Sequence, residues 1–288
     1  MIVVTGATGQ LGHAIVQKLI KHLHTSQVGV SCRDPEKAIH LSSQGVRVRR
    51  GDFAVPDTLA DAFEGATQIL LVSSNARTYG GDPLAQHTAV IDAAKKAGVR
   101  RIVYTSQIAS SAASAFPPAH DHALTEEMLA ESGLAWTALR NGFYAQSGIM
   151  MLDEALKTGC LETTQDGKVS WTAHEDLAEA AAAILADEGR FEGPTSPLTG
   201  TEALDFGDMA AIAAEVTGKH VKRIVITDDQ MREKLAGRGT PVHVTDMVLG
   251  LYTAARNGEF EDSNSLLKNL IGRAPKTMKD LMAASMNS

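Results

Sequence analysis

The 288-residue chain has a globular composition, with 44% hydrophobic and 21% charged residues, so it can bury a full core without disulfides or structural metals. Its net charge of −7 excludes an overall positive field that would hold nucleic acid or an anionic membrane surface. The two cysteines, Cys32 and Cys160, lie far apart in no metal-binding spacing, and such sparse usage is typical of a reducing compartment. We therefore expect a cytoplasmic protein without nucleic-acid or membrane partners.

The first two-thirds of the chain alternates short β-branched segments with longer helical patterns, which is typical of parallel β-α-β units. Predicted strands lie at 2–4, 28–30, 46–48, 69–72, 102–104 and 136–139. Gly65, Gly98 and Gly133 each fall where a helix should end. Crossovers of this length predict an α/β fold over residues 1–192, with a Rossmann-type, doubly wound parallel sheet.

After about residue 193 the pattern changes to a smaller, helix-rich region that extends to residue 288. Predicted helices occupy 204–217, 228–236, 244–257, 263–271 and 277–286. Glycines at 218 and 258 follow two of them, as expected for helix ends. Because open parallel sheets bind ligands at the carboxyl ends of their strands, we expect residues 193–288 to cover a substrate cleft there.

Gly6, Gly9 and Gly12 form a G-x-x-G-x-x-G motif between the first strand and an amphipathic helix. The first glycine permits a tight turn, the second lets the backbone approach a pyrophosphate, and the third lets helix and strand pack closely. The helix start offers free N–H groups and the positive end of its dipole to phosphates. A turn without a ligand is the alternative, but the strand–turn–helix context favours a bound dinucleotide.

The second predicted strand is followed by Arg33, Asp34 and Pro35. An NAD-selective site usually has a carboxylate here for the ribose 2′-hydroxyl, whereas an arginine suits the 2′-phosphate of NADPH. Asp34 precedes a proline and is better used as a helix N-cap. Arg33 therefore favours NADPH, with an ordinary surface arginine as the alternative. Asp52, after the third strand, can accept the adenine amino group or can begin a helix near Pro56.

Small polar residues follow the remaining strands, where a ribose and a nicotinamide would lie. They are Ser73, Ser74 and Asn75 after the fourth strand, Thr105 and Ser106 after the fifth, and Asn141 and Gly142 after the sixth. Each alone is no more than a turn residue. Their shared position at strand ends predicts contacts with the cofactor.

With these residues the chain resembles the NmrA-like group of atypical short-chain dehydrogenase/reductases, and within it the quinone and triphenylmethane dye reductases. The resemblance is carried by residues 4–12, 33–38, 93–99, 104–106, 139–144 and 267–272, which span nearly the whole chain. It implies NADPH-dependent hydride transfer to quinones or similar conjugated aromatic electrophiles.

The resemblance also implies roles for individual residues. Implied cofactor contacts are Gly6, Thr8, Gly9, Gln10, Leu11, Arg33, Ser73, Ser74, Asn75, Asn141 and Gly142. Phe143 and Tyr144 match the aromatic side of the substrate pocket, and core packing after a strand is the alternative for both.

Most short-chain reductases use a Tyr-x-x-x-Lys pair, in which the lysine lowers the tyrosine pKa for proton transfer at neutral pH. None of Tyr79, Tyr104, Tyr144 and Tyr252 is followed four residues later by a lysine, and the lysine position falls near His122. Alcohol–carbonyl interconversion, epimerisation and sugar dehydration, which depend on that pair, are therefore not expected.

The segment His120-Asp121-His122 and the nearby Glu126 contain metal-binding side-chain types. Catalytic metal sites usually gather three ligands from converging elements, so we expect no metal here. We interpret the segment as a helix start in which His122 faces the acceptor and at most assists catalysis. A purely structural role is the alternative.

Two function hypotheses follow. The first is an NADPH-dependent reductase of quinones or related aromatic electrophiles. The second is a redox sensor in which the same fold binds NADP(H) and regulates a protein partner without turnover. The missing dyad is common to both, and the resemblance to the quinone reductases favours the enzyme.

Overall fold

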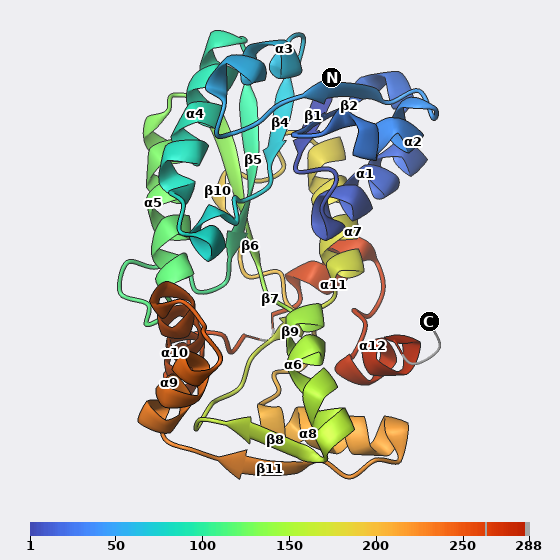
Figure 1. The fold of residues 1–288 in the computed structure, drawn as a ribbon. Coiled ribbons are helices and arrows are strands. Elements are labelled where there is room, and N and C mark those ends of the chain that lie inside the picture. Colours follow the sequence, from blue (N-terminus) through green and yellow to red (C-terminus); the bar gives the residue numbers. More distant parts are fainter. Residues whose placement is uncertain (263, 286–288) are drawn as a thin grey trace. The chain divides into compact units, whose positions relative to one another are not determined.

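The computed structural model describes residues 1–262 and 264–285. Its main feature is a seven-stranded sheet with the order β10-β6-β5-β4-β1-β2-β3 (Figure 1). The strands are β1 Ile2–Thr5, β2 Val28–Cys32, β3 Arg47–Arg50, β4 Gln68–Leu71, β5 Arg101–Gln107, β6 Ala135–Asn141 and β10 Gly193–Pro194. The β1–β2, β2–β3, β1–β4, β4–β5 and β6–β10 pairs are parallel. The Rossmann-type fold is confirmed, and each of the predicted strands is present.

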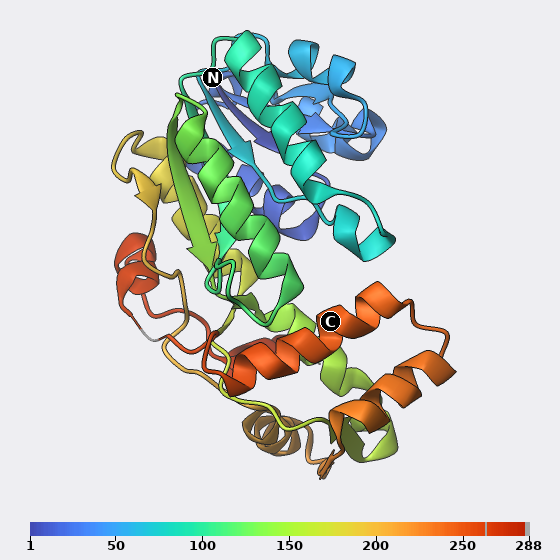
Figure 2. The ribbon, with the colours of Figure 1, turned by 90° about the vertical axis from the view of Figure 1, so that its left-hand side faces the viewer.

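Helices cover both faces of this sheet. One face carries α1 Gln10–His22 and α7 His174–Ala186, which pack against each other (Figure 1). The short α2 is Ile39–Ser42. The other face carries α3 Leu59–Phe63, α4 Pro83–Lys96 and α5 Pro117–Glu131, and α4 and α5 run side by side in Figure 2. Short 3-10 turns lie at Thr25–Gln27, Pro35–Ala38 (η2), Pro56–Thr58 and Ala76–Tyr79.

The chain divides into two compact units that alternate along the sequence. The first contains residues 1–106, 121–140 and 174–196 and holds the sheet. The second contains 107–120, 141–173 and the described part of 197–288. The sequence predicted two domains that are each continuous in the chain, residues 1–192 and 193–288, and this division stays a prediction. It did not anticipate that the segments following β5 and β6 would pack with the C-terminal helices.

The second unit contains two small parallel sheets and most of the C-terminal helices. β8 Cys160–Thr163 pairs with β11 Lys222–Val225, and β7 Phe143–Tyr144 pairs with β9 Trp171–Thr172. The helices are α6 Ala145–Thr158, α8 Phe206–Thr217, α9 Asp228–Gly237, α10 Val242–Arg256, α11 Leu266–Ile271 and α12 Met278–Ser285. The five predicted C-terminal helices are present within a few residues of their expected bounds. Ser263 and Met286, the predicted ends of two of them, lie outside the described residues.

An aromatic cluster forms part of the core of the second unit. The ring of Phe143 lies 5.7 Å from that of Phe116, 5.4 Å from that of Trp171 and 5.3 Å from that of Phe260, measured between centroids. These tilted and edge-to-face arrangements are favourable for aromatic pairs. Phe143 therefore has a packing role whatever else it contacts.

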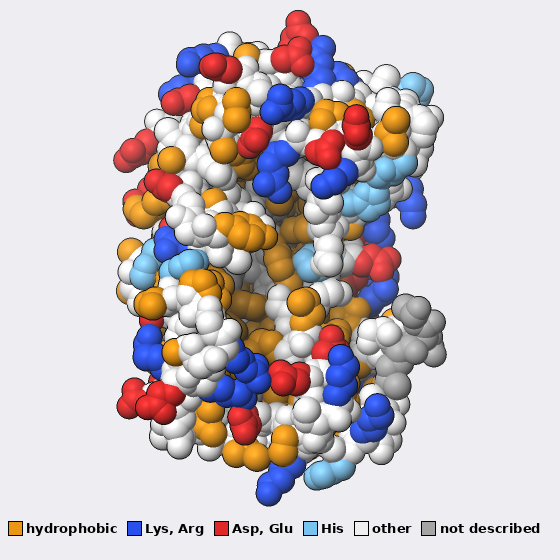
Figure 3. Space-filling model, in the orientation of Figure 1, with side chains coloured by type: hydrophobic (Ala, Val, Ile, Leu, Met, Phe, Trp, Pro, Cys, Tyr) orange, Lys and Arg blue, Asp and Glu red, His pale blue; other side chains and the backbone are white. Residues whose placement is uncertain are grey.

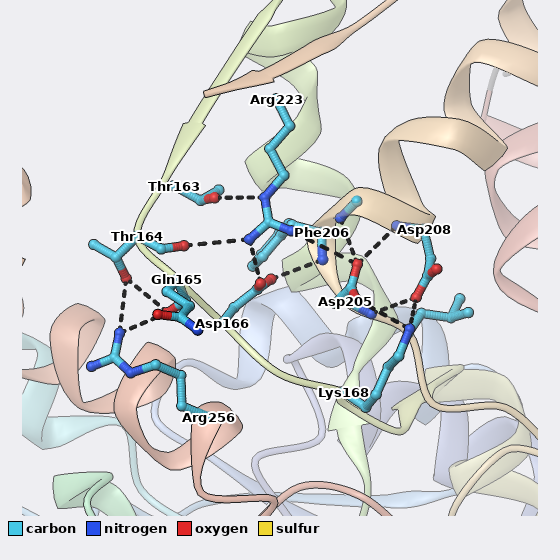
Figure 4. A network of polar contacts seen from close by, with 12 residues as sticks. Thr163, Thr164, Gln165, Asp166, Lys168, Asp205, Phe206, Asp208, Arg223 and Arg256 are labelled. Atoms are coloured by element: carbon cyan, nitrogen blue, oxygen red, sulfur yellow. Dashed lines mark hydrogen bonds and ion pairs between the residues drawn. The ribbon is translucent and has the colours of Figure 1, made fainter. Parts of the chain in front are cut away.

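A network of charged residues ties β8, β11 and the start of α8 together within the second unit (Figure 4). Arg223 on β11 donates to Thr163 Oγ1 at 3.1 Å and to the Asp166 carboxylate. The other Asp166 oxygen accepts the Phe206 N–H at 2.9 Å, so one buried carboxylate holds both an arginine and a helix start. Asp205 caps the same helix by accepting the N–H groups of residues 207 and 208.

Outside these networks, basic and acidic side chains are interspersed on the face shown in Figure 3. Among the described residues, no helix is both long enough and apolar enough to cross a membrane.

Replacing Asp166 by alanine should destabilise the second unit. The Phe206 N–H would lose its acceptor and the Arg223 guanidinium would lose its buried carboxylate partner, which should lower the free energy of unfolding by about 2–4 kcal/mol. Urea unfolding followed by fluorescence measures this, because Trp171 lies in the same unit. Glu154→Ala is the control: its pair with Arg238 is exposed, and loss of that pair should change stability by no more than about 0.5 kcal/mol. Equal stability of the two variants would contradict the assigned role of Asp166.

Candidate functional site

The strand order of the sheet reverses between β1 and β4. On one side of this point β1 is followed by β2 and β3, and on the other side β4 is followed by β5 and β6. Ligands of open parallel sheets bind at the carboxyl ends of the strands at such a reversal. The hydroxyl of Thr5, at the end of β1, joins the two central strands. It donates to the Leu70 carbonyl at 3.0 Å and accepts the Val72 N–H at 2.9 Å.

The three glycines of the motif occupy three different environments at this point. Gly6 has a φ of +61°, a left-handed conformation that side chains rarely adopt. A Cβ added at Gly12 would lie 2.4 Å from the Gly6 carbonyl oxygen, so helix α1 can approach β1 only with glycine there. A Cβ added at Gly9 would meet only Gly6 O, at an ordinary 3.4 Å, and Gly9 is exposed. The protein itself therefore requires glycine at positions 6 and 12, whereas position 9 is open.

The first turn of α1 is open to an anionic group. Gly9 is the N-cap residue and provides no side-chain cap, and the turn contains no acidic residue. Thr8, Gly9 and Gln10 are exposed, whereas Leu11 is buried and anchors the turn to the core. The predicted residues Gly6, Thr8, Gly9 and Gln10 thus form one exposed turn, anchored by the buried Leu11, with helix N–H groups behind it, as a phosphate site requires.

At the end of β2, Arg33 is exposed and Asp34 is used locally. The Asp34 carboxylate accepts the Glu36 N–H at 3.2 Å and begins the turn η2, as its position before a proline predicted. Asp52, beyond β3, accepts the Ala54 N–H at 3.0 Å with one oxygen. That bond holds the loop in which the residue lies, so the adenine contact of Asp52 stays a prediction.

Ser73, Ser74 and Asn75 follow β4 at the reversal point, and hydrogen bonds hold the first two in place. The Ser73 N–H donates to Thr105 Oγ1 at 2.8 Å, and the Ser74 N–H donates to His87 Nε2 at 2.9 Å. Asn75 is exposed and begins the turn that follows. The loop is therefore a fixed platform beside the glycine turn.

His87 is a buried, neutral support for this platform. Because Nε2 accepts from Ser74, the ring proton is on Nδ1, which donates to Thr125 Oγ1 at 2.8 Å, and Thr125 in turn donates to the Asp121 carbonyl at 2.7 Å. Burial lowers the pKa of His87 to about 3, and a positive charge on the nearby His122 would lower it further. Sequence patterns gave no sign of this role, because its partners come from the loop after β4 and from α5, both distant from His87 in the sequence.

His122 lies in the second turn of α5 and shares a hydrogen bond of 2.7 Å with the buried Tyr104 hydroxyl through Nδ1. Burial lowers the pKa of His122 to about 4, although the carboxylates of Asp121 and Glu126 act to raise it. The imidazole is therefore neutral at physiological pH. The neutral imidazole can form hydrogen bonds, but it carries no extra proton that it could donate as a general acid at this pH.

The neighbouring acids are engaged in ion pairs. Asp121 forms a bidentate pair with Arg77, and Glu126 forms one with Arg140 at 2.7 and 3.1 Å while accepting from Ser106 at 2.6 Å. Over residues 1–262 and 264–285, no group of three or more potential ligands is arranged to hold a metal. The acids of this segment hold α5 to its own unit.

The remaining predicted residues, Asn141 to Tyr144, belong to the second unit. Gly142 is tightly enclosed, since an added Cβ would lie 2.3 Å from Thr172 Oγ1, and its N–H donates to the Leu198 carbonyl at 2.9 Å. Tyr144 has its hydroxyl hydrogen-bonded to the Asn141 side chain, and burial raises its pKa. Phe143 lies in the aromatic cluster, as the packing alternative predicted, and its contact with an acceptor stays a prediction.

Several buried oxygen atoms around this segment have no hydrogen-bond partner among the described residues. They are Asn141 Oδ1, Gln107 Oε1, Ser110 Oγ and Gln146 Oε1. The Ile108 N–H donates to the Asn141 carbonyl at 2.9 Å, which joins the end of β5 to that of β6. Unpartnered buried acceptors are costly in a folded protein unless a ligand or water donates to them. They suit a neutral group with N–H or O–H donors, which fits the amide of a nicotinamide.

A sheet whose strand order reverses beside a glycine turn, with a helix start open to phosphate, defines the class of dinucleotide-binding Rossmann proteins. The sequence profile of the NmrA-like family matches residues 1–275. The chain therefore belongs to the NmrA-like family.

The chain is similar along its full length to characterised reductases. It is 34% identical over 288 residues to quinone oxidoreductase 2 of Escherichia coli (strain K12), covering 100% of this chain and 99% of that protein. It is 29% identical over 285 residues to the NAD(P)H azoreductase of Xenophilus azovorans, covering 99% and 97% of the two chains.

Solved structures agree with the sequence comparison. The NADPH-dependent quinone oxidoreductase of Escherichia coli complexed with NADPH matches with a TM-score of 0.92 over 100% of both chains, at 34% identity. The triphenylmethane reductase of Citrobacter sp. complexed with NADP(H) matches with a TM-score of 0.87 over 99% of both chains, at 32% identity.

The different environments of Gly9 and Gly12 predict opposite effects of the same substitution on stability. Gly12→Ala places a methyl group against the Gly6 backbone and should destabilise the fold by about 1–3 kcal/mol or more, although alanine is otherwise favoured in a helix. Gly9→Ala should change stability by less than about 0.5 kcal/mol, since its Cβ has room. Thermal unfolding of the two variants measures the difference. A destabilised Gly9→Ala would mean that the protein, rather than a ligand, requires this glycine.

Proposed function

We propose that this protein is an NADPH-dependent oxidoreductase that reduces quinones or similar conjugated aromatic electrophiles. The observation that carries the proposal is the space at Gly9. Glycine there serves no packing need of the chain, yet it keeps a helix start open where a pyrophosphate would bind. The names of its relatives, a quinone oxidoreductase and an azoreductase, support the same chemistry.

The residues present fit the cofactor. Gly6, Thr8, Gly9, Gln10 and Leu11 would hold the pyrophosphate, and Arg33 would bind the 2′-phosphate. Asp52 would contact the adenine, and the platform Ser73, Ser74 and Asn75 would contact the riboses. When bound, NADPH supplies the hydride.

In the second unit, we propose that Asn141 and Gly142 contact the nicotinamide end of the cofactor and that Phe143 and Tyr144 border the acceptor ring. The unpartnered Asn141 Oδ1 supports the first assignment, because it can accept from the carboxamide. The aromatic character of Phe143 and Tyr144 supports the second, since flat conjugated acceptors stack on aromatic side chains.

The absence of a Tyr-x-x-x-Lys pair limits the reaction to acceptors that need little help from a protein acid. A quinone becomes a hydroquinone anion whose charge its aromatic ring spreads, whereas a simple ketone becomes a far more basic alkoxide that requires a donor. The neutral His122 can orient or hydrogen-bond an acceptor, but its lowered pKa makes it a poor store of protons at neutral pH. We propose that His122 assists at most.

We further propose that the partner of this protein is a small-molecule acceptor and that the protein works in the cytoplasm. The mixed surface charge and the sparse, unpaired cysteines support both statements.

Cofactor selectivity tests the nucleotide assignment. Because the Asp34 carboxylate beside Arg33 accepts the Glu36 N–H and leaves the arginine unpaired for a 2′-phosphate, NADPH should bind at least about tenfold tighter than NADH, a difference of about 1.4 kcal/mol. Arg33→Ala should remove most of this difference while leaving NADH affinity unchanged. Titration of cofactor fluorescence measures both affinities. Equal binding of the two cofactors by the unmodified protein would refute the assignment.

Acceptor selectivity tests the chemistry. The protein should oxidise NADPH with quinones or cationic dyes and be nearly inert with simple aliphatic ketones, as absorbance of NADPH can show. His122→Ala should lower turnover by no more than about a hundredfold, the lower end of general-acid effects. Complete loss of quinone turnover in a folded, NADPH-binding His122→Ala variant would make the histidine essential. NADPH binding without turnover of any acceptor would instead favour the redox-sensor hypothesis.

A further inference from the structure

Two arginines differ from all the others in the described part of the chain. The side chains of Arg33 and Arg50 make no hydrogen bond, ion pair or ring contact, whereas each other arginine side chain of residues 1–262 and 264–285 makes a hydrogen bond or an ion pair. Both are exposed. Their guanidinium groups are therefore available to a ligand.

The two unpaired arginines lie at adjacent strand ends. Arg50 is the last residue of β3 and pairs in register with Cys32, the last residue of β2, and Arg33 is the next residue of the chain. The Gly51 N–H donates to the Cys32 carbonyl at 3.0 Å, so the two chains are still joined at this point. Neighbouring strands are about 4.8 Å apart, which places both arginines beside one position at the carboxyl edge of the sheet.

The other arginines of β3 show that this arrangement is not a general property of the strand. Arg49 pairs with Glu64 at 2.7 Å, and Arg47 donates to the carbonyls of Ala62 and Glu64. Successive side chains of a strand point to opposite faces, so Arg47 and Arg49 share the face of α3 and Arg50 projects to the other side. Arg50 therefore takes no part in the contacts that hold α3 to the sheet.

The acids near the pair are directed elsewhere. The Asp34 carboxylate accepts the Glu36 N–H and lies 3.8 Å from Lys37 Nζ, and Asp52 accepts the Ala54 N–H. Two neighbouring cations without an anion repel each other, and the repulsion is relieved when a dianion binds between them. Two guanidinium groups can also share the oxygens of one phosphate, each through paired N–H donors.

From this placement we propose that Arg50 acts with Arg33 as a second ligand of the 2′-phosphate, so that a pair of arginines determines the preference for NADPH. The proposal rests on the proposed function, because it assumes that the adenosine half of the cofactor lies at the ends of β1 and β2. It adds Arg50, on the edge strand β3, as a residue that determines cofactor specificity. Neither the glycine motif nor the identity of the residue after β2 predicts this role for Arg50.

Binding measurements with ligands that differ in the 2′-phosphate test this proposal without turnover. NADPH and NADH are titrated by fluorescence, and 2′,5′-ADP and 5′-AMP by calorimetry. Arg50→Ala should weaken NADPH and 2′,5′-ADP by about five- to tenfold and leave NADH and 5′-AMP within twofold, since a charge-assisted bond to the phosphate is lost. Arg50→Lys keeps the charge but not the forked donors, so it should recover part of the lost affinity.

Arg100→Ala is the matched control. It removes the same charge from an exposed side chain, but Arg100 precedes β5 at the opposite, amino edge of the sheet and pairs with Glu188. All four affinities should stay within twofold of the unmodified protein. Circular dichroism and thermal unfolding establish that the variants remain folded.

The possible outcomes separate this proposal from the function on which it rests. A wild-type preference for NADPH that Arg50→Ala leaves unchanged would overturn the role of Arg50 alone and leave Arg33 as the only arginine ligand. A parallel loss of NADPH and NADH affinity would also overturn it, because the effect would not concern the 2′-phosphate. Failure of the wild-type protein to bind either cofactor would overturn both proposals.

Discussion

The contact between the start of α1 and the Gly6 carbonyl is the constraint on which the candidate site depends. With 2.4 Å between that oxygen and an added Cβ at position 12, only glycine lets the helix lie this close to β1. The approach buries Leu11, Ile15 and Leu19 against the sheet. It also directs the first-turn N–H groups toward the carboxyl edge, so the packing that stabilises α1 produces an anion-binding position as well.

Some charged side chains of the first unit form ion pairs that stabilise the fold, and others are left available to a ligand. The acids around α5 are consumed in bidentate pairs with Arg77 and Arg140, and the two buried histidines are neutral because burial lowers their pKa values. The two arginines of this unit without a hydrogen bond or an ion pair, Arg33 and Arg50, lie at the ends of β2 and β3. A site for a multiply charged phosphate ligand needs this combination, in which the interior is electrically satisfied and the unpaired cations are at the edge.

The sequence was sufficient for the sheet, the C-terminal helices and the glycine turn because those features are recorded in short-range periodicity and in residues with special backbone demands. It could not give contacts between residues far apart in the chain. Tyr104 and His122 are separated by a crossover, and only the folded α5 brings the imidazole to the hydroxyl. For Phe143 the identity of the residue suits both core packing and acceptor binding, and its aromatic neighbours come from three other segments.

The position of His122 suggests how a family fold can lose a proton-transfer device and keep hydride chemistry. The sequence predicts that the lysine position of the Tyr-x-x-x-Lys pair falls near His122, and this histidine shares a hydrogen bond with a different tyrosine, Tyr104, which is buried in β5. Burial holds the imidazole neutral, so the pair fastens α5 to the sheet and stores no proton for an acceptor. An enzyme built in this way has no protein acid to protonate the basic alkoxide that a simple ketone would form. It is suited to acceptors whose own conjugation stabilises the added electron pair. The preference for quinones over ketones then results from the absence of a protein acid and does not require an additional contact with the quinone.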